Sequence, residues 1–226
     1  MQSSARVVII GGGIMGASLL YHLAELGWTD IMLIEKDELT SGSTWHAAGQ
    51  CPSITGSFNL AKIHAYSNEL YPKLEGLTGQ YVSWHKSGGI RFATNERELA
   101  WLRYIHGFSK IIGFDMEIIP PEEIRRINPF VTTEGVIAGG YTTGDGHADP
   151  SGICNALAIG AKQMGATIVR KNRVTGLTQL PSGEWDVETE KGTVRAGIVV
   201  NAAGCYARQV AQMAGIDIPV TNMEHH

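Results

Sequence analysis

The sequence predicts an α/β fold with a parallel sheet, interrupted by an inserted domain of the α+β type. Three observations predict it. A short apolar run at residues 7–10 is followed at once by a glycine-rich turn and an apolar helix. The same alternation of strand and helix patterns returns after residue 146. The block between them, residues 81–145, contains strands and helices without a βαβ rhythm.

These changes in the pattern of predicted strands and helices set the expected domain boundaries. We expect the first part of a cofactor-binding domain at 1–80 and an inserted domain at 81–145. The second part of the cofactor-binding domain follows at 146–215, and 216–226 begins a return to the inserted domain.

The first elements form a βαβ unit. Residues 7–10, "VVII", are apolar and β-branched, as in a buried parallel strand. The helix that follows has leucines at helical spacing and stops at Gly27, a residue type typical of helix C-termini. A second apolar run, "IMLI", leads to Glu35 and predicts the next strand.

Local signals also define the middle elements. Residues 57–77 have an amphipathic pattern that predicts a helix. We expect 81–94 to be strand-like with a turn at Gly88-Gly89, and Asn95 to cap the helix that follows. A Pro-Pro turn at 120–121 begins a short helix, which stops before Pro129.

The last third returns to the first pattern. Asp149 can cap a helix whose first residue is Pro150. A hairpin turn is predicted at Ser182-Gly183, and the apolar run "IVVNAAG" predicts a strand that ends near Gly204.

Composition narrows the class of function. The net charge is -4, and no basic run or long apolar run suggests a nucleic acid or a membrane as partner. Three widely spaced cysteines, Cys51, Cys154 and Cys205, form neither a disulfide framework nor a metal pattern, so we expect no metal. The expected location is the cytoplasm, or the mitochondrial matrix for a processed eukaryotic chain.

The glycine loop is the first chemical motif. Gly11, Gly13 and Gly16 form G-x-G-x-x-G between a predicted strand and a predicted helix. These glycines permit a tight turn, close approach of a pyrophosphate and close helix packing, and Glu35 stands where a carboxylate can bind a ribose diol. Glycine loops are common, and the alternative for Glu35 is a solvated acid beside Lys36. The pattern indicates a dinucleotide but does not separate NAD from FAD.

Longer motifs carry a family resemblance. The chain resembles the D-amino-acid-oxidase-type (DAO) superfamily of FAD enzymes, especially its sarcosine and dimethylglycine dehydrogenase branch. The segments that carry it are "VVIIGGGIMGASLLYHLAELG", "IEKDELTSGSTWHAAG", "PPEEIRRINPFV", "GDGHADP" and "VVNAAGCYARQVAQMAGIDIPV". The resemblance implies a Rossmann-like FAD-binding domain of the GR2/DAO type and an inserted substrate domain.

The resemblance assigns roles to individual residues. In that branch the histidine of "SGSTWHAAG" carries FAD covalently, which points to His46. A neutral imidazole is a competent nucleophile, although His46 could also be an ordinary loop histidine beside a packing tryptophan, Trp45. The full set of expected cofactor contacts is Gly11, Gly13, Gly16, Glu35, Lys36, Ser43, Thr44, His46, Val174, Ala202, Ala203 and Gly204.

Two histidines are candidates for catalysis. His225, in "NMEHH", matches a histidine on the substrate side of the flavin in related enzymes, but it could also begin an engineered polyhistidine tail. His147, in "GDGHADP", is either close to the flavin or a plain turn residue. Arg91 is a candidate carboxylate anchor, and the alternative is an ordinary strand residue.

The expected activity is FAD-dependent oxidation of a small N-methylated amine of the sarcosine or dimethylglycine type. One alternative is another DAO-superfamily reaction, on an amino acid or a glycerol-phosphate-type alcohol. The superfamily's substrate domain continues past such a chain, so we expect a truncated form, which leaves a non-catalytic FAD-binding fragment or subunit as a further alternative. The electron acceptor stays open between oxygen, an electron-transfer flavoprotein and a quinone.

Overall fold

A computed structural model describes residues 2–223, and these form two compact units. Unit 1 comprises the described parts of Met1–Ala48, Leu74–Val82 and Pro150–His226. Unit 2 comprises Gly49–Lys73 and Ser83–Asp149. The inserted domain that we predicted at 81–145 lies mostly in unit 2, which also takes in Gly49–Lys73; the functional division into domains stays a prediction.

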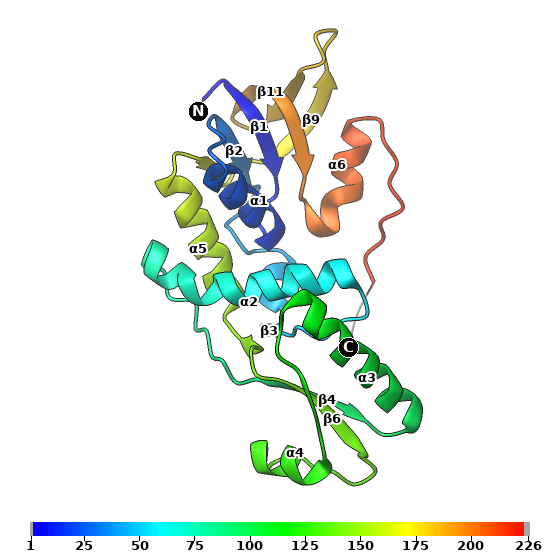
Figure 1. The fold of residues 1–226 in the computed structure, drawn as a ribbon. Coiled ribbons are helices and arrows are strands. Elements are labelled where there is room, and N and C mark those ends of the chain that lie inside the picture. Colours follow the sequence, from blue (N-terminus) through cyan, green and yellow to red (C-terminus); the bar gives the residue numbers. More distant parts are fainter. Residues whose placement is uncertain (1, 224–226) are drawn as a thin grey trace. The chain divides into compact units, whose positions relative to one another are not determined.

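Unit 1 is built on a six-stranded sheet with the order β8-β2-β1-β11-β10-β9 (Figure 1). The first four strands in this order run parallel, and β10 pairs antiparallel with both of its neighbours. The strands are β1 (Ser4–Ile10), β2 (Ile31–Ile34), β8 (Thr167–Val169), β9 (Val174–Gln179), β10 (Trp185–Thr189) and β11 (Gly192–Asn201).

The parallel register brings the carboxyl ends of three strands together. Ile10 of β1 lies opposite Ile34 of β2 on one side and Asn201 of β11 on the other. In α/β sheets, ligands bind outside the carboxyl ends of parallel strands, where successive connections diverge. The loops after β1, β2 and β11 therefore form the part of unit 1 where a ligand site is expected.

Helices cover both faces of this sheet. Helix α1 (Ile14–Glu25) packs beside α5 (Pro150–Gln163), as Figure 1 shows, and Gly16 of α1 lies close to the Leu33 side chain of β2. Helix α6 (Ala207–Met213) contributes Val210 to a cluster that contains Met32 and Ile34. Because neighbouring side chains of a strand point to opposite faces, α1 and α6 lie on opposite sides of the sheet.

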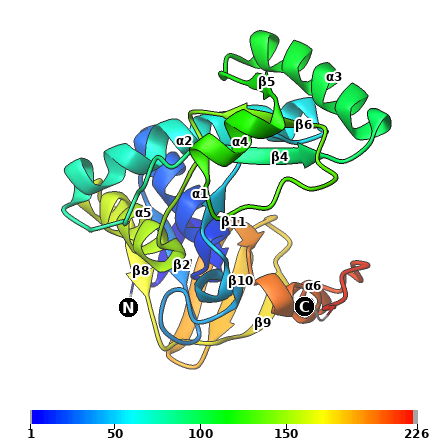
Figure 2. The same cartoon turned by 90° about the horizontal axis from the view of Figure 1, so that it is seen from below.

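Unit 2 contains a three-stranded antiparallel sheet with the order β4-β6-β5, seen from below in Figure 2. Its strands are β4 (Gly89–Ala93), β5 (Glu117–Ile119) and β6 (Ala138–Thr142). Its helices are α3 (Glu96–Ile112), α4 (Pro121–Ile127) and most of α2 (Phe58–Thr78). A short ladder pairs β3 (Gln50–Cys51) with β7 (Gly146–His147).

Two glycines of β6 explain how helices lie close to this sheet. A Cβ at Gly140 would meet Leu102 of α3 at 3.0 Å, and a Cβ at Gly139 would meet Ile124 of α4 at 2.9 Å. Adjacent strand residues face opposite sides, so α3 and α4 cover opposite faces. The α3 face forms the core of unit 2, with Ile54, Ala93, Leu99, Leu102, Ile105, Met116 and Ala138 buried together.

Most sequence-predicted elements are confirmed. The Asn95 side chain accepts a hydrogen bond from Glu98 N and caps α3, and Gly27 adopts φ 80° after α1. The expectation for 81–94 is only partly confirmed. The chain turns at Gly88 (φ 72°) and Gly89–Ala93 is a strand, but residues 81–87 form no strand, and Ser83 (φ 50°) turns the chain out of the extended conformation.

The fold class is confirmed as a mixed α/β structure with a parallel sheet. Among the helices of residues 2–223, none combines the length and the apolar character needed to span a bilayer.

Candidate functional site

The glycine loop joins β1 to α1 at the carboxyl edge of the unit 1 sheet. Gly11 has φ 118°, and a Cβ there would lie 2.4 Å from the Ala202 carbonyl oxygen. A Cβ at Gly16 would lie 1.9 Å from the Gly11 carbonyl oxygen. Both positions therefore require glycine for the backbone to pack. At Gly13 the nearest obstacle is a side-chain atom, Thr44 Oγ1, at 3.1 Å.

The start of α1 has the electrostatic character of an anion site. Gly13 is its N-cap and supplies no side-chain cap, and its first turn contains no acidic residue. The partial positive charge of the helix start is thus not neutralised within that turn. These features fit the pyrophosphate of a dinucleotide, which such helix starts bind.

Glu35 is a buried carboxylate that accepts a hydrogen bond from the backbone of the glycine loop. It is 8% exposed, Gly12 N donates to its Oε2 at 2.6 Å, and Asp37 N donates to its Oε1 at 2.8 Å. The alternative of a solvated acid beside Lys36 is therefore wrong. Each carboxylate oxygen accepts more than one hydrogen bond, so the group retains acceptor capacity for a ribose diol. Gly12, which the motif leaves as an unspecified position, was missed by sequence reasoning.

The segment after Glu35 forms a 3-10 turn, η1 (Ser43–His46), beside the helix start. Thr44 is buried, and its Oγ1 accepts a hydrogen bond from Ile14 N at 3.0 Å. The Thr44 hydroxyl thus contacts the protein's own helix, whereas Ser43 is exposed. Of these two expected cofactor contacts, Thr44 is buried and Ser43 is exposed.

His46 and Trp45 lie at the exposed end of η1. Their ring centroids are 3.7 Å apart with planes tilted by 34°, and the Trp45 side chain is 57% exposed. Trp45 is therefore not the core residue of the alternative interpretation. A histidine in this position is open to a ligand that approaches the glycine loop.

The segment after β11 completes the site in unit 1. Ala202 and Ala203 follow the strand and approach Gly11, and Ser43 Oγ lies 3.4 Å from Cys205 Sγ. Lys36 Nζ lies 4.0 Å above the Tyr206 ring, so the loop after β2 also contacts this segment. Val174 is buried at the start of β9, in the core cluster of the sheet.

The candidate catalytic residue that the structure describes belongs to the other unit. His147 belongs to unit 2, where its ring stacks on His85 at 4.9 Å and its Nδ1 lies 3.4 Å from Ser87 Oγ. His85 was missed by sequence reasoning, since only the bridge between His85 and His147 brings them together. His225 lies outside the described residues. Arg91 stacks over Trp101 at 5.1 Å.

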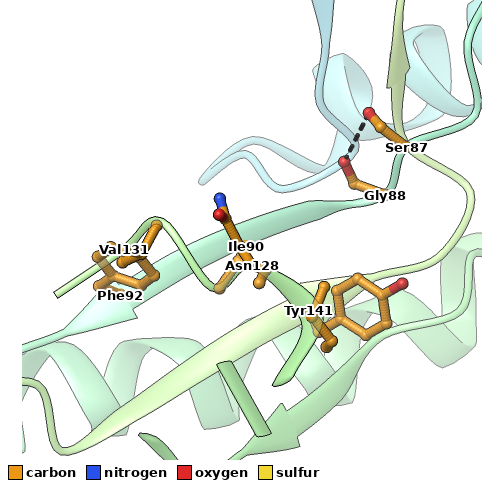
Figure 3. Close-up of a pocket in the computed structure, with 8 residues that line it drawn as sticks. Ser87, Gly88, Ile90, Phe92, Asn128, Val131 and Tyr141 are labelled. Atoms are coloured by element: carbon orange, nitrogen blue, oxygen red, sulfur yellow. Dashed lines mark hydrogen bonds between the residues drawn. The ribbon is translucent and has the colours of Figure 1, made fainter. Parts of the chain in front are cut away.

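Unit 2 also contains a shallow pocket of about 380 Å³. Figure 3 shows it between β4, β6 and the end of α4. Its walls are Ser87, Gly88, Ile90, Phe92, Ile127, Asn128, Val131 and Tyr141. Ser87 connects this pocket with His147, through the contact described above.

Comparison with known proteins gives a consistent result. A family model described as "FAD dependent oxidoreductase" (DAO) matches residues 6–226. Mitochondrial dimethylglycine dehydrogenase of Rattus norvegicus is 45% identical over 99% of the chain, which spans 26% of that relative. Mitochondrial sarcosine dehydrogenase of Mus musculus is 33% identical over the whole chain, which spans 25% of that relative. The chain thus spans about a quarter of the length of these relatives.

A solved structure has the same fold. L-proline dehydrogenase from P. horikoshii is superimposable with a TM-score of 0.88 at 29% identity. The match covers 96% of this chain and 57% of that protein.

Proposed function

The chain belongs to the FAD-dependent oxidoreductase (DAO) family, and on that premise we propose that it binds FAD and takes part in oxidising a small N-methylated amine bearing a carboxylate. The observation that carries the proposal is the 45% identity to a dimethylglycine dehydrogenase along nearly the whole chain. The geometry of unit 1 supports it, because the glycine loop, a buried carboxylate and a surface histidine meet at one sheet edge.

The loop Gly11–Gly16 would hold the pyrophosphate of FAD, because the start of α1 presents partial positive charge there. Glu35 accepts hydrogen bonds from the adenosine ribose with the capacity left after its two backbone contacts. The remaining contacts come from Lys36, Ser43 and Val174, and from the backbone of residues 202–204. Thr44 acts through Ile14 N, by holding η1 against the helix start.

His46 carries the flavin covalently in this proposal. An imidazole nitrogen of His46 would supply the nucleophile that holds the flavin, with its proton lost and dioxygen as the two-electron oxidant. The exposure of His46 supports this assignment, since the reacting nitrogen needs access to its partner.

The chemistry that bound FAD supplies is acceptance of a hydride from the N-methyl carbon of the amine. The substrate must first lose its ammonium proton, because the nitrogen lone pair forms the iminium as the hydride leaves. His147, or His225, accepts that proton. Water then adds to the iminium carbon, and formaldehyde and the demethylated amine separate.

Two other functions are alternatives to the proposed one, and the experiment below distinguishes them from it. Another DAO-family reaction would use a primary or cyclic amino acid, or glycerol 3-phosphate. A chain that spans a quarter of its relatives could also be a module that binds FAD without turnover. The test is anaerobic mixing of the purified flavoprotein with dimethylglycine, sarcosine, N-methylaminobutyrate, glycine, proline or glycerol 3-phosphate, one at a time, while the flavin absorbance near 450 nm is followed.

We expect the N-methylated acids to bleach the flavin and to release formaldehyde in equal amount. Bleaching by proline, glycine or glycerol 3-phosphate alone would replace the proposed substrate class. A flavin that dithionite reduces, but that no compound of this panel bleaches, would favour the non-catalytic module.

A further inference from the structure

We propose that Trp45 is a positioning residue for His46, holding the imidazole in the orientation from which the flavin is attached. The inference rests on the proposed function. It goes beyond that function by assigning a role to a tryptophan whose exposure a core residue would not show. The observation that carries it is the stack of the two rings at 3.7 Å in η1.

The stack is anchored to the glycine loop. Thr44 precedes Trp45 and is 8% exposed, and its Oγ1 accepts the Ile14 N–H at the start of α1. Ala47 N donates to the Thr44 carbonyl at 3.2 Å and closes the turn. The backbone on both sides of the ring pair is therefore fixed relative to the loop where the pyrophosphate binds.

Trp45 and His46 are both exposed, so packing in the core does not account for the contact between their rings. An exposed histidine side chain samples several rotamers, because nothing restricts its two torsions. The ring centroids are 3.7 Å apart and the planes are tilted by 34°, so the two rings are in close contact. Contact of this kind favours one imidazole rotamer. Trp45 is 57% exposed, so its ring is not held by the core and is free to contact His46.

The stack also leaves the reactive atoms available. The lone pair of a neutral imidazole nitrogen lies in the ring plane, whereas stacking uses the ring face. Trp45 can therefore restrict the ring without masking the nitrogen that forms the bond. Holding a nucleophile in a near-attack orientation accelerates a reaction without tighter binding of its partner. Loss of Trp45 should accordingly slow attachment more than it weakens FAD binding.

The test uses Trp45→Leu, Trp45→Phe and His46→Ala, with Phe130→Leu as a matched control, because Phe130 is an aromatic residue that is 97% exposed in unit 2. Each protein is prepared without flavin and then given FAD in air. Total bound flavin is measured after desalting. Covalent flavin is measured over time in the acid-precipitated pellet. The ring-proton chemical shifts of His46 report the stack independently of flavin.

We expect Trp45→Leu to bind FAD within about twofold of wild type and to attach it about tenfold more slowly or worse. Trp45→Phe should restore attachment to within about threefold, because phenylalanine keeps an aromatic face. Phe130→Leu should match wild type. The upfield shift of the His46 ring protons should vanish in Trp45→Leu and return in Trp45→Phe.

Three outcomes would overturn the inference. The first is attachment by Trp45→Leu at the wild-type rate. The second is equal loss in the Leu and Phe variants together with lost FAD binding, which indicates a structural role only. The third is a wild-type pellet without flavin. That result removes His46 as the attachment site and with it the role of Trp45, and the wild-type arm alone identifies this case.

Discussion

Cys154 shows how burial raises the pKa of a single thiol. It is fully buried in α5, and its thiol donates to the Gly12 carbonyl at 3.6 Å. Burial, and then the negative charge of Glu35, raise the pKa of this thiol from 9.0 to about 12. Burial, and then Asp145, raise the pKa of the Cys51 thiol from 9.0 to about 11. Cys205 is exposed.

These differences predict which thiols react. The thiolate is the nucleophile, so iodoacetamide at pH 8.5 should modify Cys205 in the folded protein and all three cysteines in urea. Peptide mass spectrometry checks the result, and Cys205→Ser should take no label when folded. Bound FAD should protect Cys205, because the site proposed for the cofactor adjoins it. Labelling of folded Cys154 at the rate of Cys205 would contradict the structure.

The same shifts have a consequence for stability. A thiol whose pKa is higher in the folded state stabilises the fold fully below pH 9, the ordinary value, and loses this contribution as the pH rises toward about 12. The loss is about 1.4 kcal/mol per pH unit for each such thiol. Urea unfolding should therefore depend less steeply on pH between 9 and 11 in Cys154→Ala than in wild type.

At the scale of elements, the glycines of the loop between β1 and α1 have different roles. Gly16 is needed for backbone packing, whereas Gly13 is proposed to leave room for the cofactor. A Cβ at Gly16 would overlap the Gly11 carbonyl, so Gly16→Ala should destabilise unit 1 by about 1–3 kcal/mol or more. A Cβ at Gly13 would lie 3.1 Å from the Thr44 hydroxyl, so Gly13→Ala should shift Thr44 slightly, cost less stability than Gly16→Ala, and lose flavin by blocking the approach of the pyrophosphate. Thermal unfolding and the flavin-to-protein ratio check both variants. Full flavin content in Gly13→Ala would show that the phosphates lie elsewhere.

At the scale of the whole molecule, each unit has a core of its own. Helix α2 contributes residues to both units, and the boundary between Lys73 and Leu74 lies near Pro72, which lacks the N–H of a regular helix hydrogen bond. We therefore expect the two units to open separately. Leu102 is 1% exposed in unit 2, and Leu102→Ala should cost about 2–5 kcal/mol there.

Hydrogen exchange measured by mass spectrometry tests this independence. In Leu102→Ala, exchange should accelerate in α3 and β6 and stay unchanged in β1 and β11. Leu60 serves as the control, because it is a leucine of the same unit that is 48% exposed, and Leu60→Ala should leave both units protected. Equal acceleration in both units would mean that they unfold as one body.

The sequence by itself determined the features that a short segment encodes. The glycine loop between a strand and a helix, the Asn95 cap and the Pro-Pro start of α4 all follow from backbone preferences of neighbouring residues. Family motifs along the chain identified the DAO family, as the match over residues 6–226 confirms. These predictions held because propensity, capping and turn chemistry act over a few residues.

Only the tertiary structure decided which groups meet and what they contact. Thr44 lies 30 residues from Ile14 and caps its helix, Ser43 lies 162 residues from Cys205, and Glu35 is buried against Gly12. No local pattern specifies these partners, because a side chain hydrogen-bonds to whatever donor the packed sheet and helices bring within reach. For the same reason the stack of Trp45 on His46 became visible only once η1 was fixed beside α1.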